Sequence, residues 1–176
     1  MKPVAFDYVR PTNVSEACGL LAADDGARVI AGGQTLIPML AMRLARPTRL
    51  VDIARIADLN FIRDDNDAVT IGATTRQAVA EADPIVAGKL PLLAKALPWV
   101  GHPPTRHRGT IGGSIANGDP AAEIPLVAVT LQATIAVQDA SGITEFPAGE
   151  FYLGPMITAA PEGAIVNTAF PSLSRA

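Results

Sequence analysis

Two glycine-rich segments hold the residues whose types and spacing could support chemistry. One covers residues 31–36 and the other covers residues 106–120. Their glycines are Gly32, Gly33, Gly109, Gly112, Gly113 and Gly118. Glycine allows a positive φ and lets another molecule approach the backbone where a Cβ would otherwise stand. Successive backbone N–H groups then form an anion-binding nest, to which a following helix N-terminus adds roughly half a positive charge. Together the segments predict a diphosphate site that needs no lysine.

Each segment and its flanking charges also have simpler explanations. Gly-Gly pairs mostly mark tight turns, so either segment alone is explained by a turn. Arg106, His107 and Arg108 could complement a diphosphate or form a plain surface cluster. Asp119 and Glu123 could form a carboxylate pair for acid–base work, or stabilise a helix start at i and i+4 by roughly 0.3–1 kcal/mol.

Motifs for several other chemistries are absent from the sequence. It contains no Gly-x-Gly-x-x-Gly, Gly-x-x-x-x-Gly-Lys or Gly-x-Ser-x-Gly, which leaves dinucleotide, nucleotide-hydrolase and serine-hydrolase functions without a signature. His102 and His107 are five residues apart, which suits neither one helix face nor a common zinc pattern, and one cysteine cannot complete a metal site. We therefore expect no bound metal.

Composition restricts the class of protein. The 176 residues are 49% hydrophobic, which is ample for a packed core. A net charge of −3 with three lysines argues against nucleic acid. Cys18 lies on an apolar stripe and is interpreted as a small buried hydrophobe. Because no leader and no run of 18 apolar residues occurs, we expect no membrane span and a cytoplasmic location.

The hydrophobic pattern around the glycine segments predicts an α+β fold with two lobes. In residues 1–55, strands at 6–9, 28–30 and 49–53 alternate with helices that begin at Asn13 and at Leu36, which implies a small parallel βαβαβ lobe. Residues 56–176 form a mixed or antiparallel α+β lobe. Its expected strands are 61–63, 68–71, 134–137, 143–146 and 164–169. Its expected helices start near Thr75, Asp83, Leu90 and Ala121, and residues 106–120 are expected to form a loop.

With their surroundings, the two segments resemble a known family. AGGQTLIP at residues 31–38 and GTIGGSIANGDPAAE at residues 109–123 are similar to the FAD-pyrophosphate loops in the flavin subunits of molybdenum hydroxylases. The resemblance is strongest to the medium subunits of aerobic carbon monoxide dehydrogenase and its relatives. It extends to FDYVRP at 6–11, LVDI at 50–53, IGATT at 71–75, FYLG at 151–154 and AFP at 169–171. Because these motifs serve the flavin, they indicate the family and not the substrate.

The resemblance implies that FAD binds in the cleft between two α+β lobes. It assigns the first FAD loop to Ala31, Gly32, Gly33, Gln34, Thr35 and Leu36. It assigns the second to Thr110, Ile111, Gly112, Gly113 and Ser114. Asn117 and Glu123 would contact the ribityl and ribose side, and Thr74 would also approach FAD. The family usually has Asn at position 114 and Asp at position 123, so the departures here affect FAD affinity. Neither loop contains His or Cys, which predicts non-covalent FAD.

The resemblance also implies a role in electron transfer. A large partner subunit would hold molybdopterin, a small partner would relay electrons through iron–sulfur clusters, and FAD on this chain would pass them to an acceptor. No catalytic side chain is expected here, nor substrate turnover by this chain alone. The family continues into a further C-terminal domain, whereas the sequence ends at Ala176. A flavin-free or degenerate assembly module, and a peroxide-forming or amine-oxidising FAD enzyme of the wider fold group, stay open as alternatives.

Overall fold

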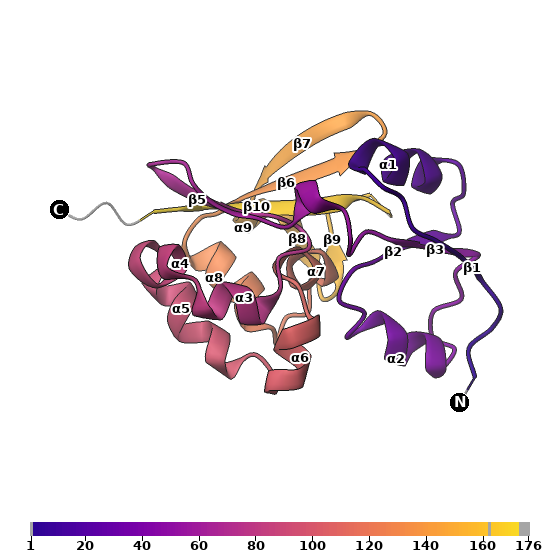
Figure 1. Cartoon of the computed structure of the whole chain (residues 1–176), viewed down its shortest axis with the longest axis horizontal. Helices are drawn as coiled ribbons and strands as arrows, with labels where there is room; N and C mark the ends of the chain where they lie inside the picture. Colours follow the sequence, from indigo (N-terminus) through magenta and orange to yellow (C-terminus); the bar gives the residue numbers. More distant parts are fainter. Residues whose placement is uncertain (1, 162, 173–176) are drawn as a thin grey trace.

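The computed structural model describes residues 2–161 and 163–172, which form two larger sheets and one two-stranded sheet with helices around them (Figure 1). The outer ends of the two predicted lobes, residue 1 and residues 173–176, lie outside the described residues. The smaller sheet has the order β1-β3-β2 and is parallel throughout. Its strands are β1 Asp7–Val9, β2 Ala27–Ile30 and β3 Arg49–Asp52, joined by α1 Val14–Ala22 and α2 Leu36–Ala41. The predicted βαβαβ arrangement is confirmed.

Helix α1 begins where the sequence predicts. The side chain of Asn13 accepts a hydrogen bond from the N–H of Glu16 at 2.9 Å. The carboxylate of Glu16 accepts from the N–H of Thr12 at 2.7 Å, one residue before the position of a standard capping box. Cys18 is buried on the inner face of α1, and this burial raises the pKa of its thiol. The environment therefore agrees with the predicted role of Cys18 as a small buried hydrophobe.

The larger sheet is antiparallel, with the order β4-β5-β10-β6-β7. Its strands are β4 Ile62–Asp64, β5 Ala68–Ile71, β6 Thr134–Asp139, β7 Gly142–Pro147 and β10 Ile165–Pro171. The last strand of the chain lies in the middle of this sheet, paired with β5 on one side and β6 on the other. Both predicted hairpins are present, and residues 57–59 form a short 3-10 helix before the first of them.

The helices between the two hairpins cover one face of the larger sheet (Figure 1). They are α3 Gln77–Ala82, α4 Pro84–Lys89, α5 Pro91–Ala96, the 3-10 helix Leu97–Trp99, α6 Pro103–Arg108, α7 Ile111–Asn117 and α8 Glu123–Thr130. Asp83 caps α4 as predicted, because its carboxylate accepts from the N–H groups of Ile85 and Val86 and Pro84 follows at the first helical position. Thr75 does not cap α3: its hydroxyl donates to the carbonyl of Phe61 instead.

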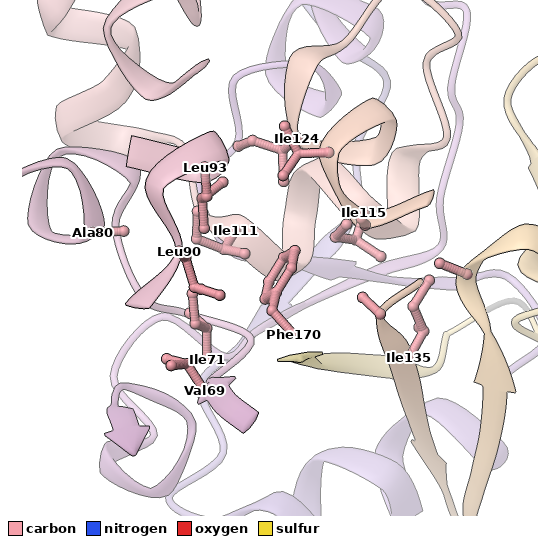
Figure 2. Close-up of a cluster of buried hydrophobic side chains, with 14 of the residues drawn as sticks. Val69, Ile71, Ala80, Leu90, Leu93, Ile111, Ile115, Ile124, Ile135 and Phe170 are labelled. Atoms are coloured by element: carbon pink, nitrogen blue, oxygen red, sulfur yellow. The ribbon is translucent and has the colours of Figure 1, made fainter. Parts of the chain in front are cut away.

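Two groups of buried side chains fill the interior. In Figure 2, Phe170 of β10 lies among Ile111 and Ile115 of α7 and Leu90 beside α5, and all four are at most 1% exposed. The other group contains Ala17 of α1 and Val51 of β3 together with Ala73 and Ile165 from the larger sheet and its loops. Apolar contacts therefore join the two sheets.

The prediction that residues 106–120 form a loop is wrong. Residues 103–108 form α6 and residues 111–117 form α7, so the second glycine segment is mostly helical. The glycine pattern suggested a loop because glycine is unfavourable inside a helix. Here Thr110 caps α7 through a hydrogen bond from the N–H of Gly113, so both glycines of the Gly112–Gly113 pair fall in the first turn. The sequence also did not reveal the small hairpin of β8 Tyr152–Gly154 and β9 Ile157–Thr158, which follows the helical turn α9 Ala148–Phe151.

Arg106 fits neither role proposed from the sequence. Its side chain is nearly buried, and its Nε donates to a carboxylate oxygen of Glu81 at 2.7 Å. The guanidinium also donates to the carbonyl groups of Val100 and Gly101. Arg106 therefore ties α6 to α3 and to the loop between Trp99 and Pro103.

Replacing Arg106 by Ala should lower the free energy of unfolding by about 3 kcal/mol, because it leaves the partly buried carboxylate of Glu81 without its cation. Urea denaturation of the two proteins would measure the change. Lys89→Ala is the matched control, since it removes the exposed Lys89–Asp64 ion pair, which solvent screens. Equal midpoints for Arg106→Ala and Lys89→Ala would contradict the assigned role.

Candidate functional site

A cavity of about 780 Å³ lies between the two sheets. Both glycine segments line it, together with residues at the ends of β2 and β10 and the stretch 156–161. The volume falls within the range of about 300–1,000 Å³ that is typical of ligand pockets. The cavity is therefore large enough for an organic cofactor.

The first glycine segment follows β2 directly and lines the cavity. Gly33 adopts φ +70°, a left-handed conformation that glycine takes without strain. Its carbonyl accepts from the N–H of Ile37 at 3.0 Å, whereas the N–H groups of Gly33, Gln34 and Thr35 have no protein acceptor within the described residues. Three successive donors are thus available to an anion in the cavity.

The second glycine segment presents the first turn of α7. The hydroxyl of Thr110 accepts from the N–H of Gly113 at 3.0 Å, and its carbonyl accepts from the N–H of Ser114 at 3.2 Å. In the part of the chain that the structure describes, the N–H of Gly112 has no acceptor. A residue that lines the cavity therefore carries an unpaired backbone donor in this segment as well.

The glycines have different roles. A Cβ on Gly32 would lie 2.5 Å from the carbonyl oxygen of Arg108, so Gly32 lets the two segments touch. A Cβ on Gly112 would lie 2.3 Å from the carbonyl oxygen of Val166 and 2.7 Å from Cα of Ala73, so Gly112 lets α7 pack on the larger sheet. A Cβ on Gly113 would approach the Thr110 hydroxyl and otherwise enter open space.

Backbone pairing holds the second segment in place. The N–H of Gln77 donates to the carbonyl of Gly109, and the N–H of Ile111 donates to the carbonyl of Thr75, both at 3.0 Å. At the other end of α7, the carbonyl of Gly118 accepts from the N–H of Met156 at 2.9 Å. The IGATT segment and the β8–β9 hairpin therefore fix α7 from both ends.

The structure brings most of the predicted site residues together. Those that line the cavity are Ala31, Gly32, Gly33, Gln34, Thr35, Leu36, Thr110, Gly112, Gly113, Ser114, Asn117 and Glu123. Two do not: Ile111 is fully buried in the core, and Thr74 is buried beside the cavity without lining it. Their side chains support the wall and do not form it.

Several lining residues were not expected from the sequence. Gln77, Val100 and Thr105 line the cavity, and so do residues 156–158, 160–161 and 163–166. The first group carries no glycine or charge pattern, the second has only the isolated Gly163, and each reaches the cavity only through tertiary pairing. No local sequence signal could have found them.

The two acidic residues do not share a helix start. Glu123 is the first residue of α8, whereas Asp119 precedes the helix and its carboxylate accepts from the N–H of Ala121 at 2.9 Å. The predicted i, i+4 placement on one helix is therefore wrong, although both residues line the cavity. Among the described residues, no group of three or more His, Cys, Asp or Glu could hold a metal ion, and no helix is long and apolar enough to cross a membrane.

The arrangement suits a cofactor that carries phosphate and hydroxyl groups. Unpaired N–H groups from both glycine segments can receive phosphate oxygens, and Gly113 leaves the space that a Cβ would fill. Asn117 and Glu123 offer side-chain groups for hydroxyls. Fold and cavity together define an α+β domain whose cavity, between two sheets, has groups suited to a phosphate-bearing cofactor.

Comparison with known proteins gives the family. Residues 4–171 match the family described as the FAD binding domain in molybdopterin dehydrogenase, and the chain belongs to it. The chain is 41% identical over 175 residues to the 6-hydroxypseudooxynicotine dehydrogenase complex subunit alpha of Paenarthrobacter nicotinovorans, covering 98% of this chain and 59% of that protein. It is 40% identical to the glyceraldehyde dehydrogenase medium chain of Sulfolobus acidocaldarius, covering 95% and 59%.

A solved structure confirms the fold. The chain superimposes on carbon monoxide dehydrogenase from Hydrogenophaga pseudoflava with a TM-score of 0.95 at 38% identity, covering 99% of this chain and 61% of that one. The resemblance to carbon monoxide dehydrogenase medium subunits is confirmed, because the chain is also 38% identical to the carbon monoxide dehydrogenase medium chain of Hydrogenophaga pseudoflava, covering 94% of this chain and 58% of that protein. The chain spans about three fifths of the length of these relatives.

Gly112→Ala and Gly113→Ala should differ sharply in stability. At position 112 the methyl group collides with backbone atoms of two other elements, so we expect little folded protein. At position 113 it meets only the Thr110 hydroxyl, so the cost should be about 1 kcal/mol, the value of a helix cap. Thermal unfolding, monitored by circular dichroism, would compare the two variants. Similar melting temperatures would show that Gly112 is not a packing contact.

Proposed function

We propose that this chain holds FAD for an electron-transfer subunit, in which the flavin receives electrons from an iron–sulfur partner and passes them to an acceptor. One observation carries the proposal: two glycine segments from different parts of the chain converge on one cavity and offer it unpaired backbone donors. Membership of the FAD-binding family supports the identity of the cofactor.

The residues of this chain bind and orient the cofactor. The N–H groups of Gly33, Gln34, Thr35 and Gly112 receive the diphosphate, and Gly113 lets it approach the backbone. Ala31, Gly32 and Leu36 shape the first loop, and Thr110, Ile111 and Ser114 shape the helical turn opposite. Asn117 and Glu123 bind ribityl and ribose hydroxyls, and Thr74 supports the wall. FAD supplies the redox chemistry, so no catalytic side chain is needed here.

The two lobes act as one binding unit in this proposal. Residues 1–55 bring the first glycine segment and residues 56–176 bring the second. Residues of both lobes line the cavity. Buried residues of both lobes, such as Val51 and Ala73, also belong to one hydrophobic cluster. FAD would therefore bridge the lobes as well as occupy the cavity.

The proposed partners are a large molybdopterin-containing subunit and a small iron–sulfur subunit. Relatives whose names include "complex subunit" and "medium chain" support a multi-subunit assembly. The names of these two relatives refer to different compounds, a nicotine derivative and glyceraldehyde. The chain is about equally similar to both relatives, so the similarity favours neither compound. The substrate of a complex containing this chain is therefore left undefined, and a cytoplasmic location stays a prediction from the sequence.

The purified chain should bind FAD without a covalent bond, because neither glycine segment contains His or Cys. Titration of FAD into the apo-protein, followed by acid precipitation, tests both parts. The yellow flavin should pass into the supernatant. A protein that takes up no FAD would support the flavin-free assembly module, and colour that stays with the precipitate would contradict the non-covalent mode.

Gly113→Val should abolish FAD binding while the fold stays largely intact. A β-branched side chain would occupy the space through which the diphosphate approaches the backbone. Gly88→Val is a matched control, since a Cβ at Gly88 in α4 would enter open space and Gly88 does not line the cavity. Circular dichroism monitors the fold and FAD fluorescence monitors binding. Wild-type affinity in Gly113→Val would mean that this turn does not meet the cofactor.

A further inference from the structure

Gln77 lies at the cavity wall with its position set by the second glycine segment. It is the first residue of α3, lines the cavity and is 6% exposed. Its backbone N–H donates to the carbonyl of Gly109 at 3.0 Å, beside the bridge between Arg76 and Thr110. The backbone of Gln77 is thus fixed in position by the second glycine segment.

The side-chain amide of Gln77 is also fixed in orientation. Its Nε2 donates to the carbonyl of Thr110 at 3.4 Å. Because that carbonyl can only accept, the amide nitrogen must face it and Oε1 must point elsewhere. A Cβ on Gly109 would lie 2.7 Å from Oε1, so the absence of a side chain at Gly109 gives the amide its space.

The carbonyl oxygen of this amide has no hydrogen-bond partner. Within the described residues, the buried polar side-chain atoms that lack a hydrogen-bond partner are Arg49 Nε, Thr74 Oγ1, Gln77 Oε1, Tyr152 Oη and Thr168 Oγ1. Of their five residues, Gln77 is the one that lines the cavity. Because buried polar atoms in folded proteins are nearly always satisfied, an orphaned acceptor on a side chain that lines a cavity points to a ligand that donates.

We propose that Gln77 is a cofactor-binding residue whose Oε1 accepts a hydrogen bond from a hydroxyl or N–H group of the bound flavin cofactor. This inference rests on the proposed function. An amide oxygen attracts donors and repels phosphate oxygens, so Gln77 receives the ribityl hydroxyls, the imide N–H of the isoalloxazine or the adenine amino group. The backbone donors of the glycine segments take the diphosphate instead, and the two kinds of contact together fix the direction in which FAD lies.

The test compares Gln77→Met with the wild-type chain in FAD affinity and in apo-protein stability. Methionine has a similar length but no acceptor of comparable strength. We expect FAD binding, measured by fluorescence titration, to weaken roughly tenfold. The melting temperature of the apo-protein should change little, because the variant loses the long Nε2–Thr110 hydrogen bond but also removes an acceptor that has no protein partner, and the Thr110 carbonyl still accepts from Ser114. A merely structural glutamine would instead lower the stability of the apo-protein.

Thr168→Val is the matched control. Thr168 is fully buried with an unpaired Oγ1, but it does not line the cavity, so FAD affinity should stay at the wild-type value. Unchanged affinity in Gln77→Met alongside normal binding by the wild type would overturn the role of Gln77 alone. A wild-type chain that binds no FAD would overturn the proposed function and this inference with it. Should Gln77→Met not fold, Gln77→Leu repeats the test, and failure of both variants to fold would assign Gln77 to the core and overturn the proposal.

Discussion

The close approach of backbone to backbone at two glycines is the constraint on which the site depends. Gly32 brings the end of the small parallel sheet against the carbonyl of Arg108, and Gly112 brings α7 against Ala73 and Val166 of the larger sheet. Any side chain at these positions would collide with backbone atoms and push the surfaces apart. Without the two contacts, the glycine segments would no longer meet at one cavity. The packing of the fold and the shape of the site therefore have the same cause.

This arrangement leaves polar groups of residues that line the cavity without a protein partner. The N–H groups of Gly33 to Thr35 and the Oε1 of Gln77 have no protein partner within the described residues. Such groups cost free energy when they are shielded from water, and a ligand that satisfies them stabilises the folded state. Ligand at one hundred times its dissociation constant adds about 2.7 kcal/mol to the free energy of unfolding. Stability and cofactor occupancy should consequently be coupled in this chain.

Local sequence chemistry was enough to predict the elements that depend on local contacts. Asn13 and Asp83 cap the helices predicted for them, and alternating apolar residues located both hairpins. The sequence was misleading where a tertiary contact determines the result. The glycines of residues 109–113 suggested a loop, but the Thr110 cap and the pairing with residues 75–77 stabilise a helix there. Arg106 resembled part of a basic surface cluster, and only the fold brings Glu81 to its side. Gln77 gave no signal, because its environment is formed by residues more than thirty positions away.

The polarity of the cavity determines how an anionic cofactor can enter it. Unpaired N–H groups lie at the first glycine segment and at the first turn of α7, whereas the carboxylates of Asp119 and Glu123 line another part of the wall. A diphosphate is attracted to the donors and repelled by the carboxylates, while hydroxyl groups can donate to either carboxylate. Reversing the cofactor would place like charges together inside a partly desolvated space, where their repulsion is stronger than in water. Under the proposed function, backbone groups, an amide and two acids of the cavity wall would therefore favour one orientation of FAD.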